Sequence, residues 1–211
     1  MPETTPASPH AATRFPAAAK LLRSAEQQAA YELIERRRGR VPAPYLPLLG
    51  SPRIADLLEQ LSTELWTGTL PQRVLEAVFL MTAHRHQCRH QWEAHATKAL
   101  SAGLSLEMVE AIAAGKIPED GGSVEAAGRF FLALTERHSV ADEVFEQVQR
   151  HFGVRGVAEL IAFCGLAGTV ALLLNVQMPH APAGPPQERE IDSDLKRRGI
   201  GQPEDPSRLA R

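Results

Sequence analysis

The chain has few of the features that point directly to a class of function. Its 211 residues include only two cysteines, Cys88 and Cys164, which is too few for a disulfide framework. Aromatic residues make up 5% of the chain, the formal net charge is −2, and no basic run is longer than Arg36–Arg38. This charge pattern gives no sign of a nucleic-acid-binding surface. The cysteine usage fits a reducing compartment, so we expect a cytoplasmic protein.

The chain also lacks the common sequence signatures of cofactor-binding and nucleophilic enzymes. It contains no P-loop, no dinucleotide-binding glycine fingerprint, no zinc-finger spacing and no nucleophile elbow. No segment shows the alternation of a strand, whereas apolar residues, 44% of the chain, recur at a spacing near 3.6. We therefore expect an all-α protein with a single helical domain of about six or seven helices, and no cofactor.

Proline-rich segments divide the chain. They predict a disordered N-terminal tail over 1–15, a helical domain over 16–179 and a flexible, charged C-terminal tail over 180–211. Helices are expected over about 17–38, from 52 to 68, over 105–114 and 123–137, and over 141–152 and 155–177. No glycine or proline interrupts the segment 72–102, so its pattern permits either one long helix or two helices broken near 84–87.

One apolar segment raises the possibility of a membrane span. Residues 160–178 carry no charge over a length close to the ~20 residues that cross a bilayer. Glycines and polar residues dilute this run, no flanking cluster of Lys or Arg orients it, and the N-terminus does not read as a secretory signal. We therefore expect a buried core helix or a subunit-interface helix, and no membrane association.

The most unusual stretch is HRHQCRHQWEAH at 84–95, which holds four of the eight histidines. His86 and His90 share a helix face, with Glu93 nearby, but a zinc site needs three or four ligands in a defined geometry. We therefore expect no metal. On one straight helix Cys88 and His95 would share a face that excludes His86, which is expected at the surface.

The same stretch also permits thiol chemistry or proton transfer. Cys88 beside imidazoles can have a lowered pKa, while Cys164 reads as a core residue. His95 can exchange a proton near neutral pH if a carboxylate accompanies it. Glu76 is the candidate because it lies inside the apolar run VLEAVFLM, although pairing with Arg73 at a helix rim is an equal alternative.

At these residues the sequence resembles the carboxymuconolactone decarboxylase / alkyl hydroperoxidase D-like family. The matching elements are Leu70-Pro71, Arg73, Glu76, the pair Trp92 and His95, Ala99, and Ala102-Gly103-Leu104-Ser105. The resemblance covers roughly residues 37–183 and extends to Leu174-Asn175. It implies an all-helical, alkyl hydroperoxidase D-like fold that associates into homo-oligomers, with trimers or hexamers expected.

The resemblance also assigns positions within a site. Glu76, Cys88 and His95 match the Glu, the first Cys and the His of the hydroperoxidase branch, and His90 matches a histidine between its two cysteines. Gln91 replaces the second cysteine of that branch. The family further implies a chain break just before Cys88. Such a break would let His95 approach Glu76, which a straight helix would hold roughly 28 Å away.

The decarboxylase branch implies a cofactor-independent lyase that acts on a small lactone or carboxylic acid, of the kind met in aromatic compound catabolism. His95 and Glu76 would carry the proton transfer. Cys88 is the remaining catalytic candidate, and the expected substrate-binding residues are His90, Trp92, Arg73 and Gln91. We expect an enzyme of this decarboxylase-like kind. The alternatives are a thiol-dependent hydroperoxidase, or peroxiredoxin-type antioxidant, that uses Cys88, and a non-catalytic oligomeric binding protein.

Overall fold

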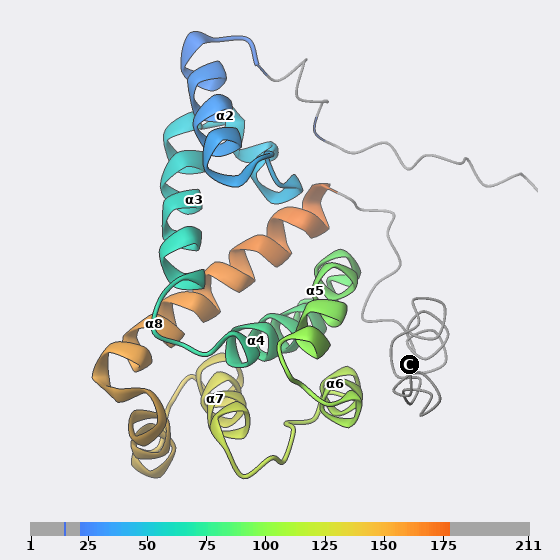
Figure 1. Cartoon of the computed structure of the whole chain (residues 1–211), viewed down its shortest axis with the longest axis vertical. Helices are drawn as coiled ribbons and strands as arrows, with labels where there is room; N and C mark the ends of the chain where they lie inside the picture. Colours follow the sequence, from blue (N-terminus) through green and yellow to red (C-terminus); the bar gives the residue numbers. More distant parts are fainter. Residues whose placement is uncertain (1–14, 16–21, 178–211) are drawn as a thin grey trace, which may run out of the picture.

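The computed structural model describes residue 15 and residues 22–177, and all regular structure within them is helical (Figure 1). The all-α expectation is confirmed. In chain order the elements are α2 (Ala25–Arg38), the short 3₁₀ helices η1 (Ala43–Tyr45) and η2 (Pro47–Gly50), α3 (Pro52–Trp66), α4 (Gln72–Arg85), α5 (Arg89–Ser101), α6 (Leu106–Ala113), α7 (Ser123–Leu132), the π-helical turn η3 (Ala133–Arg137) and α8 (Asp142–Gln177). The predicted tails lie outside the described residues, apart from Phe15.

Helix α4 is the centre of the fold. Every residue from Val74 to Ala83 is buried, and the helix packs against α5, α6, α7 and α8. A helix that is apolar on all sides must have every face covered by other parts of the protein, which explains the central position of α4. Glu76 and Thr82 are the polar members of this buried stretch, and Thr82 donates to the carbonyl of Val78.

The segment 72–102 forms two helices, which settles the choice that the sequence left open. Helix α4 ends in a Schellman motif: Cys88 N–H donates to the carbonyl of Ala83 and Gln87 N–H donates to that of His84. Gln87 takes the left-handed conformation that this motif requires, with φ 50°. Cys88 is then the N-cap of α5, and α5 packs back against α4.

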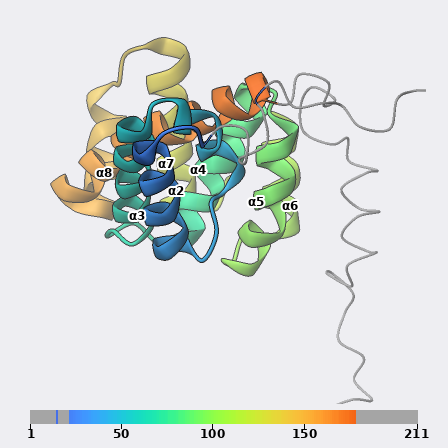
Figure 2. The ribbon, with the colours of Figure 1, turned by 90° about the horizontal axis from the view of Figure 1, so that it is seen from above.

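The N-terminal elements form a second, smaller core. Helix α2 packs on α3 (Figure 2), and Ile34, Tyr45 and Leu49 are buried between them. The predicted first helix over about 17–38 is only partly covered, because residues 16–21 lie outside the described residues. Residues 22–24 are not helical: Ser24 is the N-cap of α2, in a capping box with Gln27, and the helix begins at Ala25.

Buried charge also joins α2 to α3. Arg37 and Arg38 donate to opposite oxygens of the fully buried Glu59 at 2.8 and 2.9 Å. Burial by itself raises the pKa of Glu59, but hydrogen bonds from Arg37, Thr63 and Arg38 outweigh it and hold this pKa below its ordinary value. This network fixes the end of α2, from which the chain enters the proline-rich segment.

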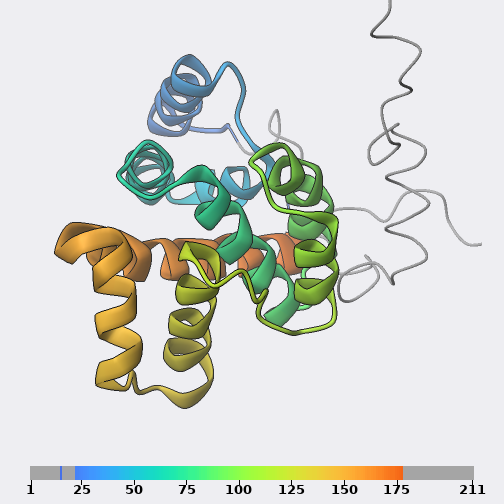
Figure 3. The ribbon, with the colours of Figure 1, turned by 60° about the horizontal axis from the view of Figure 1, so that its bottom comes forward.

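Helix α8 is kinked at Gly153, whose φ of 65° and ψ of 178° are not helical. The two helical arms match the predicted helices over 141–152 and 155–177, and the first arm lies beside α7 in an antiparallel hairpin (Figure 3). By length and composition α8 could cross a membrane, yet 44% of its most apolar window is buried inside the fold. The core helix of a globular domain has the same character, so this feature alone is weak evidence of a membrane span.

Candidate active site

The break between α4 and α5 brings Glu76 and His95 together. Nδ1 of His95 lies 2.8 Å from Oε2 of Glu76, and Nε2 of Gln72 donates to Oε1 of the same carboxyl group at 3.1 Å. Glu76 is 2% exposed. Because an amide N–H can only donate, this arrangement suits a carboxylate that accepts at both oxygens, and it directs the Nδ1 proton of His95 toward Glu76. The nitrogen of His95 that remains for a ligand is Nε2.

Aromatic rings fix the orientation of the imidazole. Trp66 stacks on His95 with ring centroids 5.8 Å apart, and Phe79 lies against it at 4.3 Å. Phe163 from α8 packs against both of these aromatic rings. The Glu76–His95 pair therefore lies in largely apolar surroundings, where a charge-assisted hydrogen bond is stronger than it is in water.

A cavity of ≈ 540 Å³ opens beside this pair. Its lining comes from five parts of the chain: the segment 38–45, α3, α4, α5 and α8. On α5 the lining residues Gln91, Ala94, His95 and Lys98 recur at helical spacing and form one stripe. Trp66, Phe79, Val170 and Leu174 supply apolar wall. The volume falls within the range of ordinary small-molecule sites.

The lining carries more positive than negative charge. Arg38 is held by Glu59, Ser62 and Thr63, whereas Arg40 and Lys98 make no ion pair with any described residue. Among the described residues that line the cavity, Glu76 is the acidic one, and it is already hydrogen-bonded to Gln72 and His95. Two unpaired cations at the mouth of an apolar cavity favour an anionic ligand such as a carboxylate.

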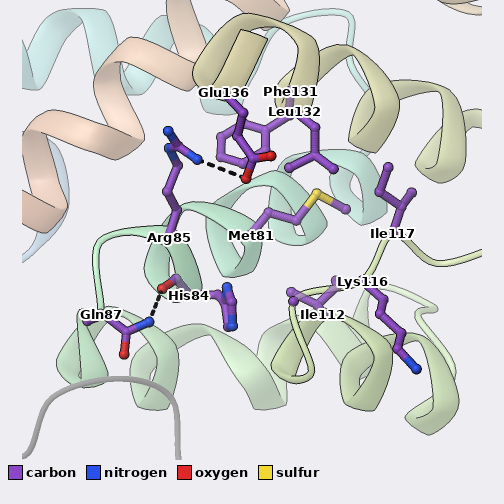
Figure 4. A pocket seen from close by; sticks show the side chains of 11 residues that line it. Met81, His84, Arg85, Gln87, Ile112, Lys116, Ile117, Phe131, Leu132 and Glu136 are labelled. Carbon is purple, nitrogen blue, oxygen red and sulfur yellow. Dashed lines mark hydrogen bonds and ion pairs between the residues drawn. The ribbon is translucent and has the colours of Figure 1, made fainter.

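The four histidines of the stretch 84–95 lie in separate environments. His95 and His90 line the cavity just described. His84 lines a second cavity of ≈ 240 Å³, with Met81, Ile117 and the paired Arg85 and Glu136 (Figure 4). His86, expected at the surface, is half-buried against α8. Its backbone carbonyl accepts a hydrogen bond from the side chain of Asn175. Burial lowers the pKa of its imidazole, and the positive charge of Arg85 adds a smaller effect in the same direction. The stretch is therefore not one site.

Neither thiol resembles a reactive cysteine. Cys88 is fully buried in the main core and does not line either cavity. Burial raises its pKa, against hydrogen bonds from the backbone of Gln91 and His90. Burial also raises the pKa of Cys164 to about 12. At neutral pH both groups are thiols rather than thiolates, and the thiolate is the nucleophilic form.

The expected substrate-binding residues separate in the structure. His90 and Gln91 line the cavity, whereas Trp92 is buried in the core and Arg73 pairs with Asp120 at 2.5 Å. Glu76 is thus partnered by His95 rather than by Arg73. Within the described part of the chain no group of three or more His, Cys, Asp or Glu residues is arranged to hold a metal ion.

Several lining residues were not singled out from the sequence. Lys98 had a usable signal, because it lies three residues after His95 and so shares its helix face. Arg40, Trp66 and Phe79 had none, since they reach the cavity only through the packing of α3 and of the segment after α2 onto the central helices.

Comparison with known families bears directly on this geometry. Residues 52–133, from the start of α3 to the end of α7, match the model of the carboxymuconolactone decarboxylase family. Over this segment the chain is similar to the carboxymuconolactone decarboxylase family. No match is found among curated proteins. The matched segment is shorter than the resemblance over 37–183, but it includes Glu76, Cys88, Gln91 and His95.

Proposed function

We propose that the chain is a cofactor-independent lyase of the carboxymuconolactone decarboxylase type that acts on a small lactone or carboxylic acid. The observation that carries this proposal is the hydrogen bond between Glu76 and His95 at the wall of a cavity that also holds Arg40 and Lys98, two cations that form no ion pair with any described residue. The family match supports the coarser part of it, a carboxymuconolactone decarboxylase or alkyl hydroperoxidase D-like protein.

The chemistry needs one proton and a place for one electron pair. When the bond between the carboxylate carbon and its neighbour breaks, CO₂ leaves and the electron pair stays on the neighbouring carbon as an enolate-like anion. Protonated His95 donates from Nε2 to that carbon, and Glu76 stabilises the imidazolium through Nδ1. The next proton comes from solvent, so no redox partner is required.

The positive charge of Arg40 and Lys98 limits how these side chains can assist the loss of CO₂. A cation that binds the departing carboxylate stabilises the substrate more than the transition state and slows the reaction. The two side chains therefore hold a second anionic group or the developing enolate oxygen. This assignment favours substrates with an anionic group besides the carboxylate that is lost. The proposed setting is a cytoplasmic homo-oligomer with a small-molecule substrate.

Replacing His95 tests the proposal. A panel of small lactone acids is incubated with the protein in D₂O, and CO₂ release and deuterium at the former carboxylate position are measured. His95→Ala should lower kcat by roughly 10²–10⁴-fold, the usual contribution of a positioned acid. Glu76→Gln should also lower kcat, because a side-chain amide N–H would face Nδ1 and reverse the tautomer.

The matched control for this experiment is Cys88→Ser, which should retain turnover because Cys88 lies outside the cavity lining. Full activity in His95→Ala would overturn the proposal, and loss of activity in Cys88→Ser alone would favour thiol chemistry.

A further inference from the structure

One buried polar atom at the cavity wall has no partner. Gln91 is 1% exposed and lines the cavity, and its Nε2 donates to the carbonyl of Phe79 at 3.0 Å. No described residue donates to its Oε1. A buried acceptor without a donor is unfavourable by the free energy of its desolvation, so it calls for an explanation.

The orientation of this amide is fixed by its anchor. If the amide were flipped, Oε1 would face the carbonyl oxygen of Phe79, and two acceptors cannot form a hydrogen bond. The same carbonyl lies within α4, one turn before Ala83, so it belongs to the rigid central helix. The amide of Gln91 therefore has an unused acceptor, and not an unused donor, in a side chain that lines the same cavity as His95.

We propose, building on the proposed function, that Gln91 selects substrates that carry a hydrogen-bond donor. The substrate class is a small anionic acid with a hydroxyl or amino group: the anionic group lies near Arg40 and Lys98, and the donor pairs with Oε1 of Gln91. A ligand that fills the cavity without a donor leaves the acceptor unpaired, and sites of this kind discriminate strongly against such analogues.

Substituted benzoates are suitable probes, because the cavity combines an aromatic wall with a cationic mouth. Benzoate and its meta- and para-hydroxy, amino and methoxy derivatives are titrated into the full chain by calorimetry. At one of the two ring positions the hydroxy and amino compounds should bind about tenfold or more tightly than benzoate. The methoxy compound, which can only accept, should show no such gain.

Gln91→Met tests the assignment to this residue. The variant removes the acceptor at similar side-chain length, and the carbonyl of Phe79 keeps its helical hydrogen bond. In this variant the hydroxy and amino compounds should bind about as tightly as benzoate, while the affinity for benzoate itself changes little. The series in the unaltered protein is an independent measurement that does not depend on the folding of a variant.

Three results would overturn the inference: equal affinity for donor and methoxy compounds in the unaltered protein, a donor preference that persists in Gln91→Met, or no binding by any probe. His95→Gln separates this inference from the proposed function. If Gln91 reads the donor, His95→Gln keeps the preference, and its disappearance there would assign the donor to His95 instead. Turnover that survives in His95→Ala would defeat the proposed function without changing the binding preference.

Discussion

At the scale of single residues, the site depends on which partner each polar group finds. From composition alone, Glu76 could pair either with Arg73 or with a distant histidine, because each would supply a hydrogen-bond donor to a carboxylate in an apolar run. The family resemblance predicted His95, and the structure places Nδ1 at 2.8 Å. Gln72 and the ring of Trp66 complete the environment. Neither contact was predictable from the sequence, because one depends on side-chain conformation and the other on the packing of α3.

The buried thiol of Cys88 gives a prediction about reactivity. Burial raises its pKa, so the thiolate fraction at neutral pH is smaller than that of an ordinary cysteine. Native protein at pH 7.5 should therefore resist iodoacetamide and hydrogen peroxide, and labelling should increase with pH only above the usual thiol range. Mass spectrometry of the labelled protein, native and in urea, measures this.

The control for this experiment is Ala94→Cys, which introduces a thiol at an exposed position on α5 in the same chain. That residue should be labelled readily in the native state. Rapid oxidation of Cys88 at neutral pH would contradict the prediction and revive the hydroperoxidase alternative.

At the scale of elements, a helix end marked by glycine was predictable from the sequence, whereas the end of α4, which has no glycine, was not. Helices α4, α5 and α6 all end in the same Schellman motif, with Gln87, Gly103 and Gly115 in the left-handed position. Gly103 was expected to close its helix because glycine favours this conformation. Gln87 carries no such signal, so the sequence permitted one long helix through the residue that actually turns the chain.

This ending predicts an unusual response to substitution at Gln87. Gln87→Gly should be more stable than Gln87→Val by roughly 1–2 kcal/mol, because a β-branched residue fits the left-handed region poorly. Inside a helix the order is reversed, since glycine is the less favourable residue there. Urea unfolding followed by circular dichroism measures both free energies of unfolding.

Ala158 in the second arm of α8 supplies the matched comparison, because it is exposed and lies within regular helix. There the Val variant should be the more stable of the pair. If the Val variant were the more stable of the pair at position 87 as well, residues 72–102 would form one continuous helix in solution. Glu76 would then be far from His95.

At the scale of the whole molecule, the Glu76–His95 pair and parts of the cavity wall come from different parts of the chain. Glu76, Gln91 and His95 lie in the segment that matches the family model. Arg40 and Leu174, from before and after that segment, complete the lining. Pattern and resemblance could therefore predict the helices and the approach of His95 to Glu76. The cavity could not be predicted, because it depends on how the N-terminal unit and α8 close over the central helices.

The outer surface of the molecule bears on the expected association into oligomers. Helix α8 exposes Ile161, Leu172 and Val176 along one face, with the small residues Gly165 and Gly168 between them. Helix α3 exposes a second stripe at Ile54, Leu57 and Leu61. Large apolar side chains that recur along one helix face are typical of surfaces covered by a partner. The small residues on α8 would allow another helix to approach closely.

We predict that the face of α8 is covered by a second copy of the chain. Sedimentation velocity over a series of protein concentrations should show an oligomer for the unaltered protein. Leu172→Glu should shift it to a smaller species, because a charge would be buried in an apolar contact. Phe145→Glu, an exposed apolar position on the other arm of α8, should leave the oligomer intact. A monomeric unaltered protein, or dissociation by Phe145→Glu but not by Leu172→Glu, would show that this face is not the interface.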